Sequence, residues 1–261
     1  MKVMGIVNVT PDSFSDGGLF LDPDKAIAHG LELVEAGADV LDIGGESTRP
    51  GAAEVSAEEE TRRVIPVIRG LAGSVPISID TTKASVASEA IAAGATIVND
   101  VSGLRLDPEM VEICAAYDLE VVIMHMVGSP RTMQNDPQYD DVVAEVRDFL
   151  MARVDFAVAS GIDRERIWID PGIGFGKTVD HNLELLKATS EFAATGLPVL
   201  LGPSRKTFIG RIDGSKEDRR LGGTIAACLE ARRGGASMVR VHDVVEVAQA
   251  LLVADQIEAA G

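Results

Sequence analysis

The chain has few of the features that would place it in a membrane or in a disulfide-rich class of proteins. Its 261 residues include two cysteines, four histidines and one tryptophan. The apolar runs are far shorter than the roughly 20 residues that a membrane-spanning helix needs. The N-terminus shows no signal-peptide pattern, so we expect no secretory leader. These absences predict a cytoplasmic location and no membrane partner.

Positive charge is also scarce. The chain carries 24 Lys and Arg residues against 41 Asp and Glu residues, which gives a formal net charge of −17. A nucleic acid or an anionic membrane is bound through a basic patch that neutralises phosphate. The charge balance therefore argues against nucleic acid as a partner. Cys114 and Cys228 lack metal-ligand spacing, and we expect both to be buried thiols in helices.

The sequence does contain eight short apolar runs, separated by stretches long enough for a helix. The runs cover residues 3–7, 40–43, 77–79, 96–98, 121–124, 167–169, 199–201 and 238–239. Because they are continuous rather than alternating, they suit parallel strands buried on both faces. Helix signals between the runs predict helices at 24–35, 57–71 and 109–116, with the longest at 140–159. Eight such units predict an α/β fold, a single-domain (β/α)8 TIM barrel over residues 1–261.

Each apolar run ends in a polar residue. In chain order these residues are Asn8, Asp42, Asp80, Asn99, His125, Asp170, Ser204 and Arg240. A polar residue after a strand can simply cap the next helix or start a turn, and for any one position this alternative stands. Active sites of barrels gather at the C-terminal ends of their strands. All eight runs share the pattern, which predicts a polar mouth.

Each of these strand-end residues belongs to a longer sequence motif. The motifs are NVTPDSFSDGG at 8–18, DIGGESTRPG at 42–51, SIDT at 78–81, NDVSG at 99–103, MHM at 124–126, DPGIGFGK at 170–177, SRK at 204–206 and RVHD at 240–243. The ordered series resembles the dihydropteroate synthase family over nearly the whole chain. The resemblance implies a transferase that joins p-aminobenzoate to a 6-hydroxymethyl-7,8-dihydropterin diphosphate, releases pyrophosphate with the help of Mg2+, and is a target of sulfonamides.

Three of the strand-end residues suit a pterin. A pterin edge is a row of donors and acceptors, and fixed carboxylate and carboxamide groups pair with such a row and reject analogues that lack it. The resemblance implies that Asp80, Asn99 and Asp170 hold the pterin. It also makes Lys206 a pterin contact that borders the p-aminobenzoate pocket.

The diphosphate requires cationic groups. Arg240 and His242 alternate around Val241, so they point the same way from the last strand, and both can bind an anion. Magnesium keeps several waters and binds largely through substrate phosphates, so one protein oxygen is sufficient. The resemblance implies that Asn8 supplies this oxygen, and that Arg240, His242 and Lys206 act in catalysis.

The segments 8–21 and 44–55 are long and rich in Gly, Pro, Ser and Thr, and we expect them to act as lids. By the resemblance, Thr48 contacts the diphosphate substrate, and Asp16 stabilises a cation on the pterin methylene or accepts a proton. The p-aminobenzoate pocket is implied to contain Phe14, Arg49, Pro50, Phe175 and Thr207. The family usually has Ser where this chain has Thr207, which bears on inhibitor fit more than on chemistry.

Two other functions remain as alternatives. A methyltetrahydrofolate:corrinoid methyltransferase shares the Asp and Asn pterin contacts, but it needs neither the 8–18 segment nor Ser204-Arg205-Lys206. A non-catalytic pterin binder would be expected to have lost anion-binding residues that this chain retains. Barrels of this family commonly pair through their last helices, so we expect a homodimer; the apolar stretch at 244–257 could equally face the barrel.

Overall fold

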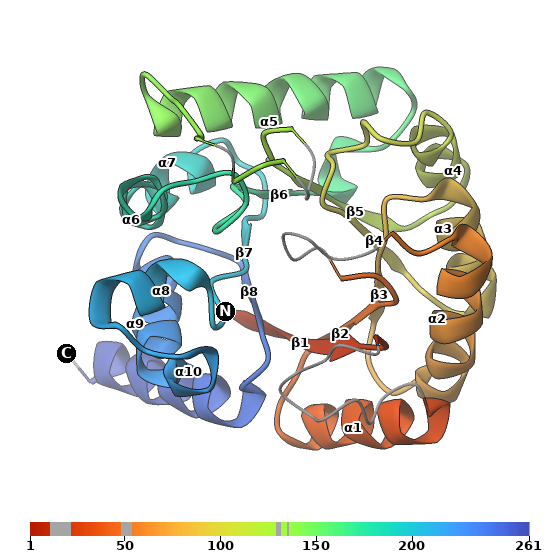
Figure 1. Ribbon diagram of the computed structural model, residues 1–261, viewed down its shortest axis with the longest axis horizontal. Helices are drawn as coiled ribbons and strands as arrows, with labels where there is room; N and C mark the ends of the chain where they lie inside the picture. The colour runs from red at the N-terminus through yellow and green to blue at the C-terminus, as the bar shows by residue number, and fades with distance from the viewer. Residues whose placement is uncertain (11–21, 48–53, 129–131, 135, 261) are drawn as a thin grey trace.

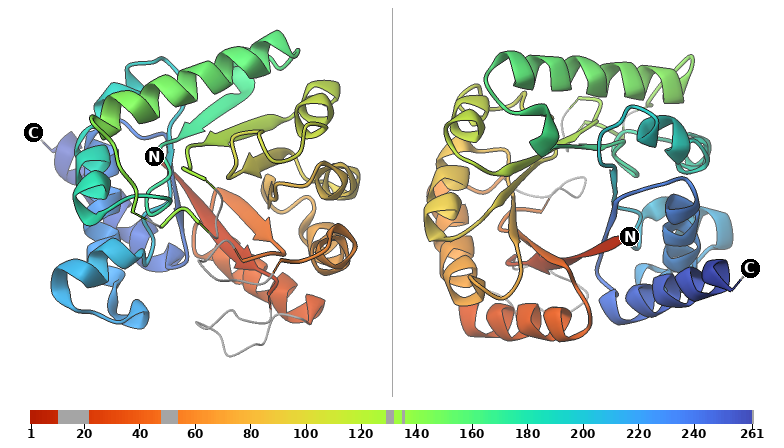
Figure 2. Two further views of the ribbon diagram at one scale, coloured as in Figure 1. Left: turned by 45° about the horizontal axis from the view of Figure 1, so that its top comes forward. Right: turned by 180° about the vertical axis from the view of Figure 1, so that it is seen from behind.

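The chain folds into a closed ring of parallel strands surrounded by helices (Figure 1). The computed structural model describes residues 1–10, 22–47, 54–128, 132–134 and 136–260. Its eight strands follow the order β6-β5-β4-β3-β2-β1-β8-β7. A bridge between Ile169 and Val199 joins the two ends of this order. The architecture is the predicted (β/α)8 TIM barrel, and Figure 2 shows its ring of helices from two further sides.

The strands coincide closely with the predicted apolar runs. They are β1 (Lys2–Asn8), β2 (Val40–Gly44), β3 (Ile77–Asp80), β4 (Ile97–Asp100), β5 (Glu120–Met124), β6 (Ile167–Asp170), β7 (Leu200–Leu201) and β8 (Met238–Val241). Asp42 lies inside β2, as it does inside the run at 40–43, and Arg240 lies inside β8 because this strand extends beyond its run at 238–239. A barrel strand can carry such residues because every second side chain points into the barrel, where two opposite charges can pair.

The helices alternate with the strands along the chain. They are α1 (Pro23–Glu35), α2 (Ala57–Leu71), α3 (Ala84–Ala93), α4 (Met110–Ala116), α5 (Val142–Ala159), α6 (Val179–Lys187), α7 (Thr189–Ala193), α8 (Thr207–Asp213), α9 (Leu221–Arg233) and α10 (Val244–Ala259), with short 3-10 turns η2 (Arg164–Arg166) and η3 (Glu217–Arg219). Ser56 caps α2 by accepting a hydrogen bond from the backbone N–H of Glu59 at 3.2 Å. The Asp141 side chain caps α5 in the same way through Ala144, so this helix begins two residues after its predicted start.

The apolar core has two main parts. A large cluster fills the space between the strands and the helices, and it includes Cys114 and Cys228, both free and buried as predicted. A smaller cluster contains Met4, Val40, Ile97, Val122, Trp168, Leu200 and Met238. These residues come from seven strands and pack together, so the barrel is filled with side chains away from its polar mouth. None of the helices in the described ranges is long and apolar enough to cross a membrane.

Candidate active site

A cavity of about 490 Å³ opens where the strands end. Seven predicted site residues line it: Asn8, Asp80, Phe175, Lys206, Thr207, Arg240 and His242. They come from β1, β3, the connection after β6, the connection after β7, the start of α8, and β8 with the residue that follows it. Asn99 and Asp170 are buried and are not among the described residues that line the cavity. The barrel therefore brings together residues that lie more than 230 positions apart in the chain.

Arg240 is held by two carboxylates. Its Nε–H donates to Oδ2 of Asp42 at 2.5 Å, and its Nη2–H donates to Oδ2 of Asp80 at 2.7 Å. The amide of Asn99 donates to the same Asp42 oxygen at 3.3 Å. Strands β2, β3, β4 and β8 are thus connected by one polar network. Asp42, which the sequence analysis named as a strand-end residue without a role, is shared by the arginine and the amide.

The electrostatics of this network are set by burial. Burial raises the pKa of Asp80 to about 7, although the charge of Arg240 opposes the rise. Burial also works against the charge of Arg240, but Asp42 and Asp80 outweigh it and raise the arginine pKa above its ordinary value. The guanidinium therefore remains charged.

A second buried group lies between β5 and the connection after β6. Lys177 Nζ is 3.0 Å from Nδ1 of His125 and donates to the carbonyl of Phe175 at 2.9 Å. Burial lowers the pKa of Lys177 to about 7. Burial and the nearby Lys177 charge lower the pKa of His125 to about 2, so the imidazole stays neutral. Lys177 lines the cavity, and the sequence analysis gave it no role.

Asp170 is buried at the end of β6. Its Oδ1 accepts a hydrogen bond from the backbone N–H of Gly172 at 2.7 Å. Burial raises the pKa of the carboxyl to about 6, and the Gly172 hydrogen bond lowers it in part. The carboxylate is therefore fixed in one orientation by the chain that follows it.

Lys206 packs across the connection after β6. Its Nζ lies 4.1 Å from the centroid of the Phe175 ring, in a cation–π contact. Gly174 has φ +84°, and a Cβ at this position would lie 2.8 Å from Cδ of Lys206. Only glycine accepts this φ without strain and leaves room for the lysine. The connection thus forms a wall against which Lys206 rests.

His242 is oriented by its neighbour at the end of β7. Its Nδ1 lies 3.1 Å from Oγ of Ser204, and its backbone N–H donates to the same oxygen at 3.1 Å. The strand-end serine thus positions the histidine that sequence analysis assigned to the anion.

Five predicted site residues lie outside the described residues. They are Phe14, Asp16, Thr48, Arg49 and Pro50. Their roles therefore stay predictions, as do those of the lids to which they belong.

Asn8 was predicted to bind magnesium. It lines the cavity on the same side as Asp80, since a Cβ on Gly44 would be 3.9 Å from Asn8 Oδ1 and 3.7 Å from Asp80 Oδ2. Within the described residues, no group of three or more His, Cys, Asp or Glu side chains could hold a metal ion. The carboxamide oxygen of Asn8 is a hard, neutral donor, which fits a magnesium ion that takes most of its ligands from water and phosphate.

The sequence also matches one known protein family over most of its length. A family model described as "Pterin binding enzyme" matches residues 4–242. Together with the fold and the polar mouth, this match defines the class as a pterin-binding barrel enzyme.

Individual relatives indicate which family within this class the chain belongs to. A curated dihydropteroate synthase from Synechocystis is 49% identical over 97% of this chain and 89% of its own length. A Xanthomonas albilineans dihydropteroate synthase structure with 4-aminobenzoic acid has a TM-score of 0.92 and 50% identity, covering 99% of this chain and 93% of the other. Another from the same organism, in complex with 7,8-dihydropteroate, has a TM-score of 0.89 and 47% identity, covering 99% and 94%. The chain belongs to the dihydropteroate synthase family of pterin-binding enzymes.

Proposed function

We propose that this chain joins p-aminobenzoate to 6-hydroxymethyl-7,8-dihydropterin diphosphate, giving 7,8-dihydropteroate and pyrophosphate. The observation that carries the proposal is one cavity lined by Asp80, Lys206, Arg240 and His242. Relatives of this family support it, since their structures hold 4-aminobenzoic acid or 7,8-dihydropteroate.

The pterin is assigned to Asp80, Asn99 and Asp170. Two carboxylates and one carboxamide in fixed orientations match the donors and acceptors along a pterin edge. Asp80 and Asp170 are largely removed from solvent, so a ligand that failed to pair with them would leave part of their acceptor capacity unsatisfied. Lys206 adds a further contact from the wall formed by Phe175.

The diphosphate is assigned to Arg240 and His242, with Thr48 on the connection after β2. Arg240 retains its charge and keeps N–H groups that the two carboxylates do not use. Asn8 is assigned to magnesium, which supplies charge neutralisation on the phosphate oxygens when it is bound. Fixed cationic groups aimed at a leaving pyrophosphate stabilise the charge that develops on it.

The reaction is assigned a dissociative course. The C–O bond to the diphosphate breaks first, and the pyrophosphate leaves with the electron pair. The cation on the pterin methylene is then attacked by the lone pair of the arylamine nitrogen, which loses a proton. Asp16 is assigned to stabilise the cation or to accept this proton. The arylamine pocket is assigned to Phe14, Arg49, Pro50, Phe175 and Thr207.

The test is direct. The purified chain is supplied with p-aminobenzoate, the pterin diphosphate and Mg2+, and dihydropteroate and pyrophosphate are measured. Chelation with EDTA should abolish product formation, and added Mg2+ should restore it. Folded protein that binds the pterin without making product would favour the binding-only alternative. Methyl transfer from methyltetrahydrofolate to a corrinoid would favour the methyltransferase.

We also propose that the chain forms a homodimer. Helix α10 leaves large apolar side chains in solvent, namely Val245, Leu252, Val253 and Ile257. Ile257 is 71% exposed, so this stripe does not face the barrel. Sedimentation should give twice the chain mass, and Ile257→Glu should give the monomer; a wild-type monomer at micromolar concentration would contradict the assignment.

A further inference from the structure

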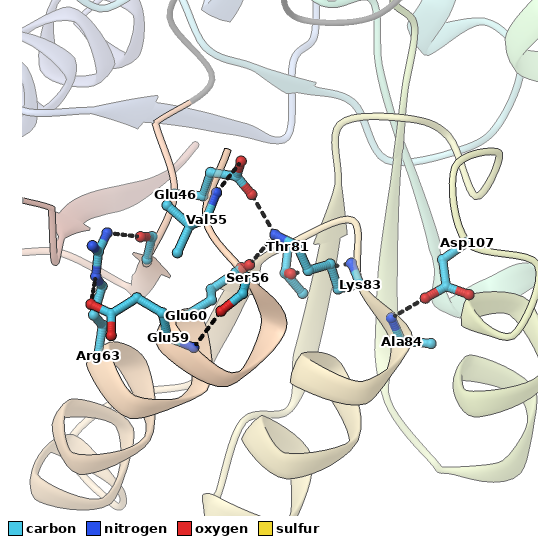
Figure 3. A network of polar contacts seen from close by, with 11 residues as sticks. Glu46, Val55, Ser56, Glu59, Glu60, Arg63, Thr81, Lys83, Ala84 and Asp107 are labelled. Atoms are coloured by element: carbon cyan, nitrogen blue, oxygen red, sulfur yellow. Dashed lines mark hydrogen bonds and ion pairs between the residues drawn. The ribbon is translucent and has the colours of Figure 1, made fainter. Parts of the chain in front are cut away.

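An ion-pair network lies beside the mouth, at the ends of β2 and β3 (Figure 3). The ammonium of Lys83 donates to Oε2 of Glu46 and to Oε2 of Glu60. Glu60 is 1% exposed, and its other oxygen, Oε1, has no hydrogen-bond partner in the described part of the chain. Lys83 therefore supplies the positive charge that offsets the free-energy cost of burying the Glu60 carboxylate.

The position of Lys83 is fixed by its backbone. It is the residue immediately before α3, and its N–H donates to Oγ1 of Thr81 at 3.2 Å. Burial works against its charge, but the hydrogen bonds to Glu46 and Glu60 prevail and raise its pKa. The side chain is thus a charged group projecting from a rigid turn that begins directly after Asp80.

Glu46 uses both of its oxygens. Oε2 accepts from Lys83, and Oε1 accepts from the backbone N–H of Val55 at 3.2 Å. Glu46 and Val55 lie near the two ends of the connection between β2 and α2. Figure 3 shows the Glu46 carboxylate linking the amide of Val55 to the ammonium of Lys83. One lysine therefore holds both ends of this connection through a single carboxylate.

The start of the connection also rests on α2. A Cβ on Gly45 would lie 2.8 Å from Cγ1 of Val64 and 2.9 Å from Cγ of Glu60. Arg63 donates to the carbonyl of Gly45 at 2.9 Å. The chain is pressed against the helix at this point, which brings Glu46 within reach of the ammonium.

The network reaches the cavity through Glu46. Glu46 and Ser47 line the cavity together with Asp80, whereas Lys83 and Glu60 do not. At 25%, the Glu46 side chain is more exposed than that of Asp80 at 11%, so it belongs to the rim rather than to the floor. In the proposed function Asp80 on the floor takes the pterin, and Phe175 and Thr207, which line the same cavity as Glu46, take p-aminobenzoate.

We propose that Lys83 is a positioning residue that acts through Glu46 to fix Glu46 and Val55 at the rim of the cavity, and so sets the affinity for p-aminobenzoate. This inference rests on the proposed function for the identity of the ligand. Its mechanical part, the fixing of Glu46 and Val55, stands on the contacts of Lys83 alone.

The principal variant is Lys83→Met, which keeps the length of the side chain and removes its charge. We expect the KM for p-aminobenzoate to rise about tenfold, with kcat changed less than twofold. The Kd of 6-hydroxymethylpterin, measured by calorimetry, should change less than twofold because the floor is untouched. Lys83→Arg should recover most of the affinity, since it restores a cation at the same place.

A second variant covers the case in which Lys83→Met fails to fold. The double variant Lys83→Met/Glu60→Gln removes the buried carboxylate charge as well, so it releases Glu46 without leaving an unpaired ion. The control is Arg62→Met, which breaks an exposed pair with Glu59 on the same helix and should leave both KM values unchanged. Folded variants with wild-type KM for p-aminobenzoate would overturn the proposal.

Hydrogen exchange at the Val55 amide separates this inference from the proposed function. Because that N–H donates to Glu46, it should exchange at least tenfold faster in Lys83→Met than in Arg62→Met. If the wild type made no dihydropteroate, the proposed function would fail, and faster exchange would still support the positioning role. Unchanged exchange at Val55 would overturn that role whatever the activity.

Discussion

Arg240 and Asp42, 198 residues apart in the chain, are joined by a hydrogen bond of 2.5 Å between Nε and Oδ2. Asp42 is fully buried and also accepts from Asn99. A guanidinium that donates to a fixed carboxylate loses much of its freedom to rotate. Asp42 thus orients one cationic group of the mouth and one carboxamide without lining the cavity itself.

Replacing Asp42 tests this relationship. Asp42→Asn keeps the shape and removes the charge that faces Arg240. Breaking a buried pair costs about 3–5 kcal/mol, and we expect about 3 kcal/mol here because Asp80 still pairs with the arginine. Urea unfolding measures the loss. Asp255→Asn, which weakens the outlying Arg232 pair, should cost less than about 1 kcal/mol. Equal losses in the two variants would contradict the assignment.

Arg240 itself is expected to act on the leaving group. Arg240→Ala should lower kcat by about 10²-fold or more, as loss of one charge-stabilising donor does in other enzymes. The variant also leaves Asp42 and Asp80 unpaired, so its unfolding must be followed by circular dichroism to separate lost folding from lost chemistry. Near-normal turnover in the folded variant would refute the role.

The barrel was predictable from sequence, but this pairing was not. Eight apolar runs with polar ends predicted eight strands, because continuous apolar runs are typical of strands buried on both faces. The Asp42–Arg240 contact depends instead on β1, which lies between β2 and β8 and pairs Ile6 with Asp42 and Met4 with Arg240. That two-residue offset is a property of tertiary register, and no local spacing encodes it.

Lys177 and Glu46 were missed for a related reason. Both stand inside motifs that the sequence singled out, DPGIGFGK and DIGGESTRPG, yet neither ends a strand. The contact between Lys177 and His125 requires the chain after β6 to turn back, which it does through glycines at positive φ. The sequence carried one signal for Lys177, because it lies among small and apolar residues and a buried lysine needs a partner.

His125 should make stability depend on pH. Its folded pKa is about 2 against an ordinary value of 6.5, so below pH 6.5 the unfolded chain binds a proton that the folded chain does not. Stability from this residue is therefore present above pH 6.5 and falls by about 1.4 kcal/mol per pH unit below it, or about 2 kcal/mol by pH 5.

The comparison is with His125→Asn, which keeps an acceptor near Lys177 but does not titrate. Urea unfolding of both proteins between pH 7 and 5 gives the difference, since the other titrating groups are common to both. Parallel stability curves would show that the imidazole is protonated in the folded chain.

Gly172 should tolerate no side chain. It has φ +73°, and a Cβ there would lie 2.0 Å from the carbonyl oxygen of His125. We expect Gly172→Ala to cost more than about 3 kcal/mol, because backbone strain of about 1–3 kcal/mol adds to a clash that only backbone movement relieves. The variant should also lose activity, since Gly172 fixes Asp170.

Gly196 provides the matched control. It has φ +78° with nothing within 4 Å of an added Cβ. Gly196→Ala should therefore cost only the strain of the left-handed backbone, about 1–2 kcal/mol. Thermal unfolding of both variants separates the clash from the strain, and equal melting temperatures would contradict the prediction for Gly172.

The barrel closes between β6 and β7, and we call this junction the seam. Strand β7 is two residues long, and among the described residues it meets β6 through the bridge of Ile169 and Val199 and one hydrogen bond from Ile169 to Pro198 at 3.0 Å. Asp170 is the last residue of β6 and Lys206 lies in the connection after β7, so the seam runs between the carboxylate and the ammonium to which the proposed function assigns the pterin. Among the described strands, this neighbouring pair is joined by an isolated bridge rather than by a ladder, so we expect the barrel to part here at least cost. If the pterin binds as proposed, it bridges this junction, and we expect the barrel to open less readily there with ligand than without it.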